Sequence, residues 1–198
     1  MFCLAIFIMY LIKTVNPVIL SYGEAEVNRL LVKSSNNAIL NISTINYDDL
    51  FTINYDDESG EVLSIISNSQ TINNIANSLA IETQKELDMN SSVGINIPVG
   101  TLSGISFLSG RGHNISFSVN PLGNVTCEFF TTFSSVGINQ TSHKIYIKIN
   151  SSASLILPFH SKVVNKNIDY LISECLIIGR IPQTYLNFSS NISDLLTP

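Results

Sequence analysis

The chain contains no tryptophan, and it has few charged residues for its 198-residue length. Charged residues make up 13%, about half the share found in an average soluble domain. Asn, Ser and Thr must therefore supply most of the polar surface. The 10 Lys and Arg residues are outnumbered by 15 Asp and Glu and form no run. Because nucleic acids need clustered cations, this distribution argues against nucleic acid, and also against tight electrostatic binding to anionic lipid.

Cysteine is scarce, with three residues in the chain. Cys3 lies in the apolar start, so Cys127 and Cys175 are the only candidates for an internal pair. Neither belongs to a CxxC motif or has ligand-like spacing to a histidine. Two small buried side chains are the simpler interpretation, because free cysteine is often buried. A disulfide requires that neighbouring strands bring the two within reach.

The sequence lacks the usual motifs of catalysis and of metal or cofactor binding. The histidines are isolated, no serine lies in GxSxG, and neither glycine-rich stretch matches a phosphate-binding loop. The carboxylates gather at an expected turn, where the burial that tunes a catalytic pKa is missing. We therefore expect no catalytic residue, metal site or cofactor. The residues considered are His113, His143, His160, the glycines of 100–104 and 110–112, and the carboxylates of 48–58.

The first residues are strongly apolar. Met1 to Ile12 contains no polar side chain except Tyr10 and Cys3, and the apolar character continues past Lys13 to Leu20. A membrane-spanning helix needs about 20 residues, and a Lys near one end can snorkel. We predict a membrane anchor over residues 1–22. A cleaved signal peptide and a buried core helix remain alternatives, although no A-x-A-like cleavage triplet follows.

The orientation of this anchor is not readable from charge. The nearest basic residues, Lys13, Arg29 and Lys33, all follow the apolar run. Taken alone, the positive-inside rule would place the rest of the chain in the cytoplasm. The missing basic flank also raises the alternative that the true start lies upstream of Met1.

The next part of the chain indicates two amphipathic helices separated by a hairpin. Residues 24–41 place apolar side chains close to a 3.6-residue rhythm, with Glu24 and Glu26 expected in the first turn. Two β-rich runs, 50–55 and 62–67, flank an Asp- and Gly-containing turn. The second helix extends to Leu87, with Ser69 or Thr71 as the expected N-cap.

From residue 93 onward the period changes to two. The clearest run is 144–157, where apolar residues alternate with Lys, Tyr, Asn and Ser. This pattern is typical of an antiparallel strand with one buried and one solvated face. Shorter alternating runs lie at 115–119 and 125–129, and 163–178 reads as a strand pair or one bent strand.

Together these patterns predict an α+β protein. We expect an N-terminal membrane helix at 1–22 and two amphipathic helices packed on a long-stranded antiparallel sheet. The sheet and helices would form one domain over residues 23–188, followed by a polar tail at 189–198.

Several short segments resemble a known family. In chain order, they are Ile97 to Gly100 with Leu102 and Gly104, Leu108 to Gly112, Pro121 to Gly123, Phe133 to Thr141, His143 to Tyr146, and Glu174 to Pro182 with Tyr185. Their order and spacing are similar to the sporulation protein YunB family of endospore-forming bacteria. The chain departs from the family at His113, where a proline usually follows the glycine turn, and in its leader, which lacks a basic start.

The resemblance implies a membrane protein that is made during sporulation and is needed for spore formation. Its domain would lie outside the mother-cell cytoplasm, in the space between mother cell and forespore, and we prefer this orientation to the one that charge suggests. The family provides no catalytic residues to transfer. Envelope proteins of the spore are the expected partners, with the membrane itself bound through the leader and lipid as a further candidate.

One segment is a candidate for partner binding. Gly137, Ile138, Asn139, Gln140 and Thr141, followed by His143, form the most specific part of the resemblance. One interpretation is a hairpin in which Gly137 supplies a positive φ and Asn and Thr bond to the backbone. The other is a loop that contacts a partner, since loops on rigid sheets often carry function.

The sequence therefore leaves three hypotheses for the function. The leading hypothesis is a non-enzymatic component of spore assembly that acts through protein contacts. The second is a carrier of lipid or another apolar ligand, which would show a deep apolar groove. The third is an enzyme acting on peptidoglycan, for which no constellation of residues is visible.

Overall fold

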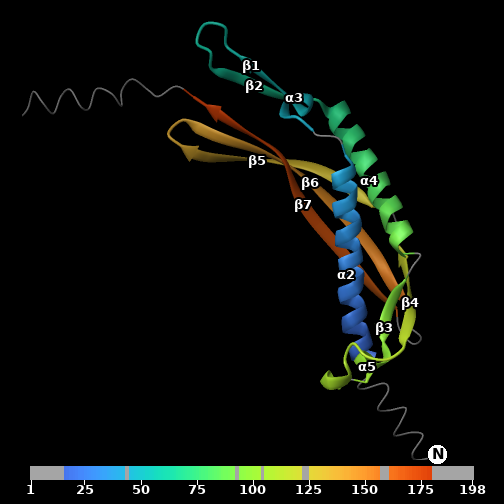
Figure 1. The fold of residues 1–198 in the computed structure, drawn as a ribbon. Coiled ribbons are helices and arrows are strands. Elements are labelled where there is room, and N and C mark those ends of the chain that lie inside the picture. Colours follow the sequence, from blue (N-terminus) through green and yellow to red (C-terminus); the bar gives the residue numbers. More distant parts are fainter. Residues whose placement is uncertain are drawn as a thin grey trace, which may run out of the picture. The chain divides into compact units, whose positions relative to one another are not determined.

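The computed structural model describes residues 16–42, 45–91, 94–103, 105–121, 125–156 and 161–179 (Figure 1). The α+β class is confirmed in these ranges. The elements follow the order α2 (Asn16–Asn41), α3 (Tyr47–Leu50), β1 (Phe51–Tyr55), β2 (Val62–Ser67), α4 (Ser69–Ser91), β3 (Ile95–Pro98), α5 (Val99–Leu102), the 3-10 helix η2 (Ser106–Leu108), β4 (Asn114–Pro121), β5 (Thr126–Gly137), β6 (Gln140–Ile156) and β7 (Ser161–Ile178).

The described strands form two antiparallel arrangements. β1 and β2 make a two-stranded sheet, with Phe51 opposite Ser67. The larger sheet has the order β3-β4-β6-β5, and β7 also pairs with β6. β6 has 17 residues and is therefore long enough to hold three partner strands; β4 pairs with its last part, where Pro121 lies opposite Ala153. The long final run is one continuous strand, β7, rather than a strand pair.

The described residues of the expected 23–188 domain divide into two compact units. Unit 1 holds residues 16–42, 74–91, 94–103, 105–121, 125–128, 148–156 and 161–169. Unit 2 holds residues 45–73, 129–147 and 170–179. Each unit has buried apolar side chains of its own.

In unit 1, α2 and the greater part of α4 lie side by side and bury one stripe each (Figure 1). On α4 the buried residues include Ala76, Leu79, Thr83 and Leu87, as the 3.6-residue period predicted. Hydrogen bonds join the two helices, including Asn37 Nδ2 to Glu86 Oε2 at 2.9 Å. Hydrogen bonds of Asn and Ser side chains thus join α2 to α4, whereas a more highly charged protein would use ion pairs.

The first helix differs from expectation at its start. α2 begins at Asn16, so Glu24 and Glu26 lie inside the helix instead of in its first turn. Further along, Gly23 faces β6 so closely that a Cβ there would come within 2.3 Å of a Leu155 methyl carbon. Glu24 forms an ion pair with Lys162 of β7. These contacts hold the first half of α2 against the sheet.

The predicted membrane anchor falls mainly outside the described residues. Of the expected segment 1–22, residues 1–15 are not described, and the remainder forms the first turns of α2. Among the helices that the structure describes, none is both long and apolar enough to cross a bilayer. The predicted tail at 189–198 also lies outside the described ranges.

The alternation along β6 is confirmed. The buried side chains are the odd-numbered ones from His143 to Leu155, whereas the even-numbered ones from Lys144 to Ser154 are half-buried. A period of two places successive side chains on opposite faces, so this register puts every apolar residue of the run in a core. Ser151, whose type does not reveal its face, follows the same parity and is buried.

Of two local details expected from the sequence, the structure corrects the first and agrees with the second. The N-cap of α4 is Asn68, not Ser69 or Thr71, because the Thr71 amide donates to Asn68 Oδ1 at 3.2 Å. The acidic turn after β1 is a hairpin connection as expected. There, Asp56 Oδ1 accepts hydrogen bonds from the Glu58 and Ser59 amides, which lower the pKa of the Asp56 carboxyl.

Candidate partner-binding surface

The predicted binding segment is the tight connection between β5 and β6 in unit 2. β5 ends at Gly137 and β6 begins at Gln140, so Ile138 and Asn139 form the turn. Gly137, Ile138 and Asn139 are exposed, whereas Gln140 and Thr141 are half-buried. The Gly179 amide, at the end of β7, donates to Asn139 O at 2.7 Å. The turn is therefore tied to the end of a third strand.

The expected role of Gly137 is wrong in its backbone geometry. Among the described residues, Asn139 adopts the positive φ of this turn, at 56°, and Gly137 does not. Asn tolerates the left-handed region better than most residues do. A Cβ on Gly137 would meet mainly the flexible Gln140 side chain, with Oε1 at 3.2 Å. Asn139, not Gly137, shapes the turn.

Several of the exposed side chains around this turn are apolar, beside the exposed polar residues Ser135 and Asn139. Ile138 at its tip is 64% exposed, and Ile178, next to the Gly179 hydrogen bond, is 68% exposed. Val136, just before the turn, is also exposed. We call Val136, Ile138 and Ile178 the turn-end surface. Exposed apolar side chains gathered on strand ends typically mark contact sites for other molecules.

His143 does not belong to that exposed surface, which corrects its expected place in the loop. Its side chain is 1% exposed. Nδ1 lies 2.7 Å from Tyr47 Oη, and the imidazole stacks on the Phe133 ring with centroids 4.2 Å apart. The Phe51 ring meets it edge-on at 5.0 Å. His143 is thus the centre of an aromatic cluster that lies within unit 2.

Sequence reasoning missed Tyr47 and Phe51, because they come from α3 and β1, far from His143 along the chain. A signal for the burial of His143 was nevertheless present. It shares the odd parity of Ile145, Ile147 and the rest of the alternating run, so the strand pattern already places it on the buried face.

The electrostatics of this cluster favour uncharged side chains. Burial lowers the pKa of His143. Burial, followed by the neighbouring Cys175 and Asp48, raises the pKa of Tyr47 to about 12. Burial and Asp48 also raise the pKa of the Cys175 thiol. A neutral imidazole, a protonated phenol and a protonated thiol suit a packed core, whereas a nucleophilic cysteine needs a lowered pKa.

One polar atom of the cluster is unsatisfied. Nε2 of His143 is buried and has no hydrogen-bond partner among the described residues. The bond to Tyr47 leaves this atom either a lone donor or a lone acceptor, depending on the tautomer. Either state carries a desolvation cost, so the aromatic packing around the ring must offset it.

Polar residues beside the cluster connect β6 to β7. Ser142 Oγ donates to Glu174 Oε1 at 2.6 Å, and Lys144 Nζ lies 3.7 Å from the same oxygen. Cys175, the next residue, is a free thiol, as is Cys127. Both are half-buried, and the disulfide left open by the sequence is not formed.

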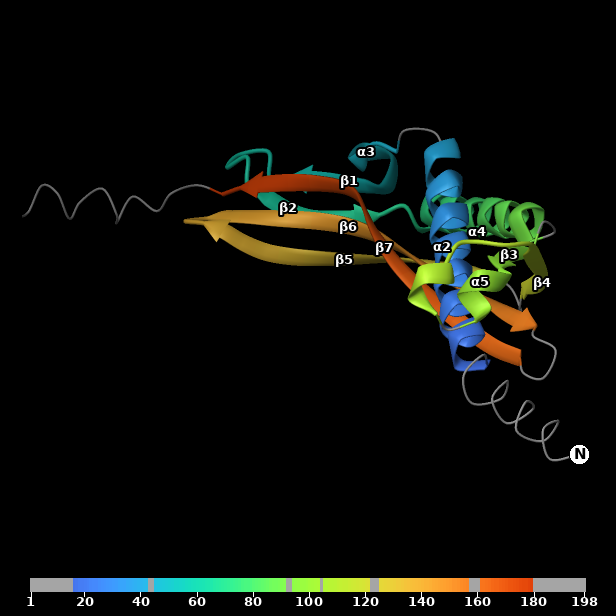
Figure 2. The ribbon, with the colours of Figure 1, turned by 60° about the horizontal axis from the view of Figure 1, so that its bottom comes forward.

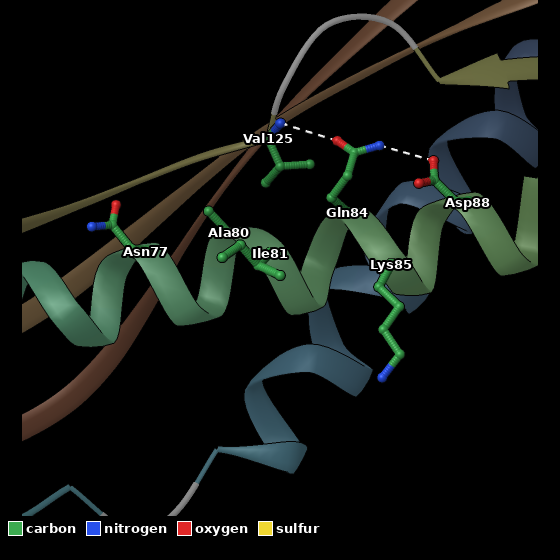
Figure 3. A pocket seen from close by; sticks show the side chains of 7 residues that line it. All are labelled: Asn77, Ala80, Ile81, Gln84, Lys85, Asp88 and Val125. Atoms are coloured by element: carbon green, nitrogen blue, oxygen red, sulfur yellow. Dashed lines mark hydrogen bonds between the residues drawn. The ribbon is translucent and has the colours of Figure 1, made fainter.

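One hollow lies along α4. It has a volume of about 660 Å³, is open to solvent and is lined by polar and charged side chains as well as apolar ones (Figure 3). At its edge Gln84 accepts from the Val125 amide at 3.2 Å and donates to Asp88 (Figure 3). Within the described ranges, no three His, Cys, Asp or Glu side chains gather as a metal site.

Comparisons with known proteins agree with the motifs. Residues 94–184 match the family described as "Sporulation protein YunB". A curated relative, "Sporulation protein YunB" of Bacillus subtilis (strain 168), is 28% identical over 186 residues, which cover 87% of this chain and 72% of the relative. No solved structure matches the chain significantly.

The matched region includes the turn, the aromatic ring partner Phe133, His143 and most of the sheet. It is the sheet-forming part of an α+β protein with an apolar turn surface and an uncharged aromatic core. Residues 94–184 match the sporulation protein YunB family, and the resemblance drawn from the motifs is confirmed. The match to this family implies a role in sporulation.

Proposed function

We propose that this protein is a membrane-anchored component of the spore envelope that acts without catalysis, through protein contacts made by the turn-end surface. The observation that carries the proposal is the position of Val136, Ile138 and Ile178. They are exposed apolar side chains at a turn that a backbone hydrogen bond to Gly179 holds in place. A preordered apolar surface binds at a lower cost in conformational entropy than a flexible loop does.

The anchoring part of the proposal rests on the sequence. Met1 to Ile12 is apolar, and the run continues to Leu20 with Lys13 as its one charged residue. The remainder of the chain would lie outside the mother-cell cytoplasm, between mother cell and forespore, as the family resemblance implies. Envelope proteins of the spore are the proposed partners.

The alternative functions receive less support from the described structure. A lipid carrier needs a cavity that encloses most of an apolar ligand. The α4 hollow instead presents Asn77, Lys85 and Asp88 beside Ile81 and is open to solvent. For an enzyme with a cysteine nucleophile, the raised pKa of Cys175 disfavours the reactive thiolate.

The test uses an endospore-forming strain in which this chain is the sole copy. Deletion should reduce the count of heat-resistant spores, and the intact chain should restore it. The protein should sediment with membranes after an alkaline carbonate wash. A spore count unaffected by deletion contradicts the sporulation role. Release by carbonate contradicts the anchor.

The side of the membrane is tested with a single cysteine. Ser152 is half-buried on the solvated face of β6, so Ser152→Cys in a chain without its native cysteines offers an accessible thiol. We expect a membrane-impermeant thiol reagent to label it in sporulating mother cells while the space around the forespore is still open to the medium. Labelling no greater than that of a cytoplasmic control contradicts the proposed orientation.

A further inference from the structure

The stretch between α4 and β5 contains no carboxylate. From Met89 to Cys127 there is no Asp or Glu, and Arg111 is the single Lys or Arg. The whole chain has a net charge of −5, so its acidic residues are concentrated elsewhere. This stretch therefore carries no charge that an anionic surface would repel.

Within this stretch, one loop of unit 1 exposes a set of apolar side chains. The loop runs from α5 through η2 to the start of β4, over residues 99–113. Phe107 at its tip is 76% exposed, and its apolar neighbours are exposed as well. We call Val99, Ile105, Phe107 and Leu108 the apolar loop surface. A phenylalanine this exposed is unusual on a surface that meets only water.

The loop is built to hold these side chains in place. A Cβ on Gly100 would lie 1.9 Å from Leu108 O and 2.5 Å from Arg111 O, so only glycine fits between these carbonyls. The Gly100 amide donates to Arg111 O at 2.8 Å, and the Gly110 amide donates to Thr101 Oγ1 at 3.0 Å. Backbone and side-chain hydrogen bonds across the loop thus hold the segment that carries Phe107.

A cation lies directly beside the exposed ring. The Arg111 guanidinium carbon is 5.0 Å from the centroid of Phe107, at cation–π distance. An aromatic ring next to an arginine can place its apolar body among acyl chains while the guanidinium stays at the headgroups. One arginine gives little electrostatic affinity, so apolar contact would supply most of the binding energy.

The loop lies close to the point where the apolar leader enters unit 1. α5 contacts both α2 and η2, and in both views it lies beside the first turns of α2 (Figures 1 and 2). Residues 1–15, which precede α2, carry the apolar run. A bilayer that receives this run is therefore within reach of the apolar loop surface.

We propose that the apolar loop surface rests in the headgroup and upper acyl region of the lipid bilayer, beside the N-terminal anchor. This inference depends on the proposed anchoring. The loop adds a second, interfacial contact, which limits how far unit 1 can tilt or rotate about a single spanning segment. Phe107 and Ile105 enter the apolar layer, and Arg111 stays with the phosphates.

The absence of tryptophan makes a direct test available. Phe107→Trp gives the full-length chain one fluorescent tryptophan on the loop, and Ile81→Trp gives a matched control on α4, where Ile81 is 69% exposed. Each variant is reconstituted into vesicles of phosphatidylcholine and phosphatidylglycerol that contain lipids brominated near the headgroup. Circular dichroism checks that both variants fold like the original chain.

We expect brominated lipid to quench tryptophan 107 several-fold more strongly than tryptophan 81, and aqueous acrylamide to show the opposite order. If the chain stays in the vesicles after a carbonate wash but both positions respond alike, the loop inference is overturned and the anchor stands. If the chain leaves the vesicles, the anchor and the loop inference both fail. Should Phe107→Trp misfold, Ile105→Trp gives the same reading.

Discussion

Single residues in this protein are defined more by their neighbours than by their type. Asn68 caps α4, Asn139 takes the left-handed backbone of the β5–β6 turn, and Asn37 bridges two helices. Gly137 and Gly100 look alike in sequence, yet one faces a mobile side chain and the other two fixed carbonyls. The residue type alone, Asn or Gly, does not distinguish these roles.

The two glycines give a residue-scale prediction. Gly100→Ala should destabilise the protein by on the order of 3 kcal/mol, because backbone carbonyls cannot move aside for a methyl group. Gly137→Ala should cost far less, since Gln140 can change rotamer. Urea unfolding of the detergent-solubilised chain measures both. If both variants lose the same free energy of unfolding, the surroundings of Gly100 or of Gly137 differ from those described.

His143 gives a prediction for pH. Its pKa is lowered in the folded protein from an ordinary value of 6.5, so the unfolded chain binds a proton first as the pH falls. Above about pH 7.5 the side chain is neutral in both states, so His143 does not change the free energy of unfolding with pH. Below about pH 6.5 protonation favours the unfolded chain, and the free energy of unfolding falls by at most about 1.4 kcal/mol per pH unit.

The measurement compares the original chain with His143→Gln between pH 7.5 and 5.5. The variant is expected to be less stable throughout, because it loses the ring contacts with Phe133 and Phe51. Its stability should fall less steeply with acid, since the titrating group is gone. Parallel pH profiles would assign the acid sensitivity to other groups.

At the scale of elements, the sequence predicted most of the helices and strands of the structure. The alternation along β6, the 3.6-residue stripe of α4 and the hairpin of β1 and β2 all follow from side-chain periodicity. Periodicity is a local property, so it does not show that α3 and β1 supply Tyr47 and Phe51 to His143. Nor does it reveal two compact units, because β6 runs through both without a break in its pattern.

The register of β6 is tested by two adjacent substitutions. Ile149→Asp places a charge on the buried face, where Ile149 is fully buried, and should cost about 3–5 kcal/mol. Asn150→Asp changes the next side chain, which is half-buried and meets Thr126 Oγ1. Because a carboxylate can still accept from that hydroxyl, the loss should be small. Comparable unfolding midpoints would contradict the register.

At the scale of the whole molecule, the protein has two kinds of apolar surface. The apolar loop surface around Phe107 belongs to unit 1 and is proposed to meet lipid. The turn-end surface around Ile138 belongs to unit 2 and is proposed to meet protein. The family match covers both. Neither surface was predictable in detail from sequence, because the residue type alone does not show whether an isoleucine is exposed or buried.

The spore count of an Ile138→Asp strain tests the central claim most directly. The matched control is Ile81→Asp, since Ile81 on α4 is as exposed as Ile138 but lies outside the turn-end surface. Both substitutions should leave folding and membrane level intact, because both side chains are largely in solvent. We predict that Ile138→Asp lowers the number of heat-resistant spores by an order of magnitude and that Ile81→Asp leaves it unchanged. Wild-type spore numbers from the Ile138→Asp strain, at a normal level of protein, would contradict the account.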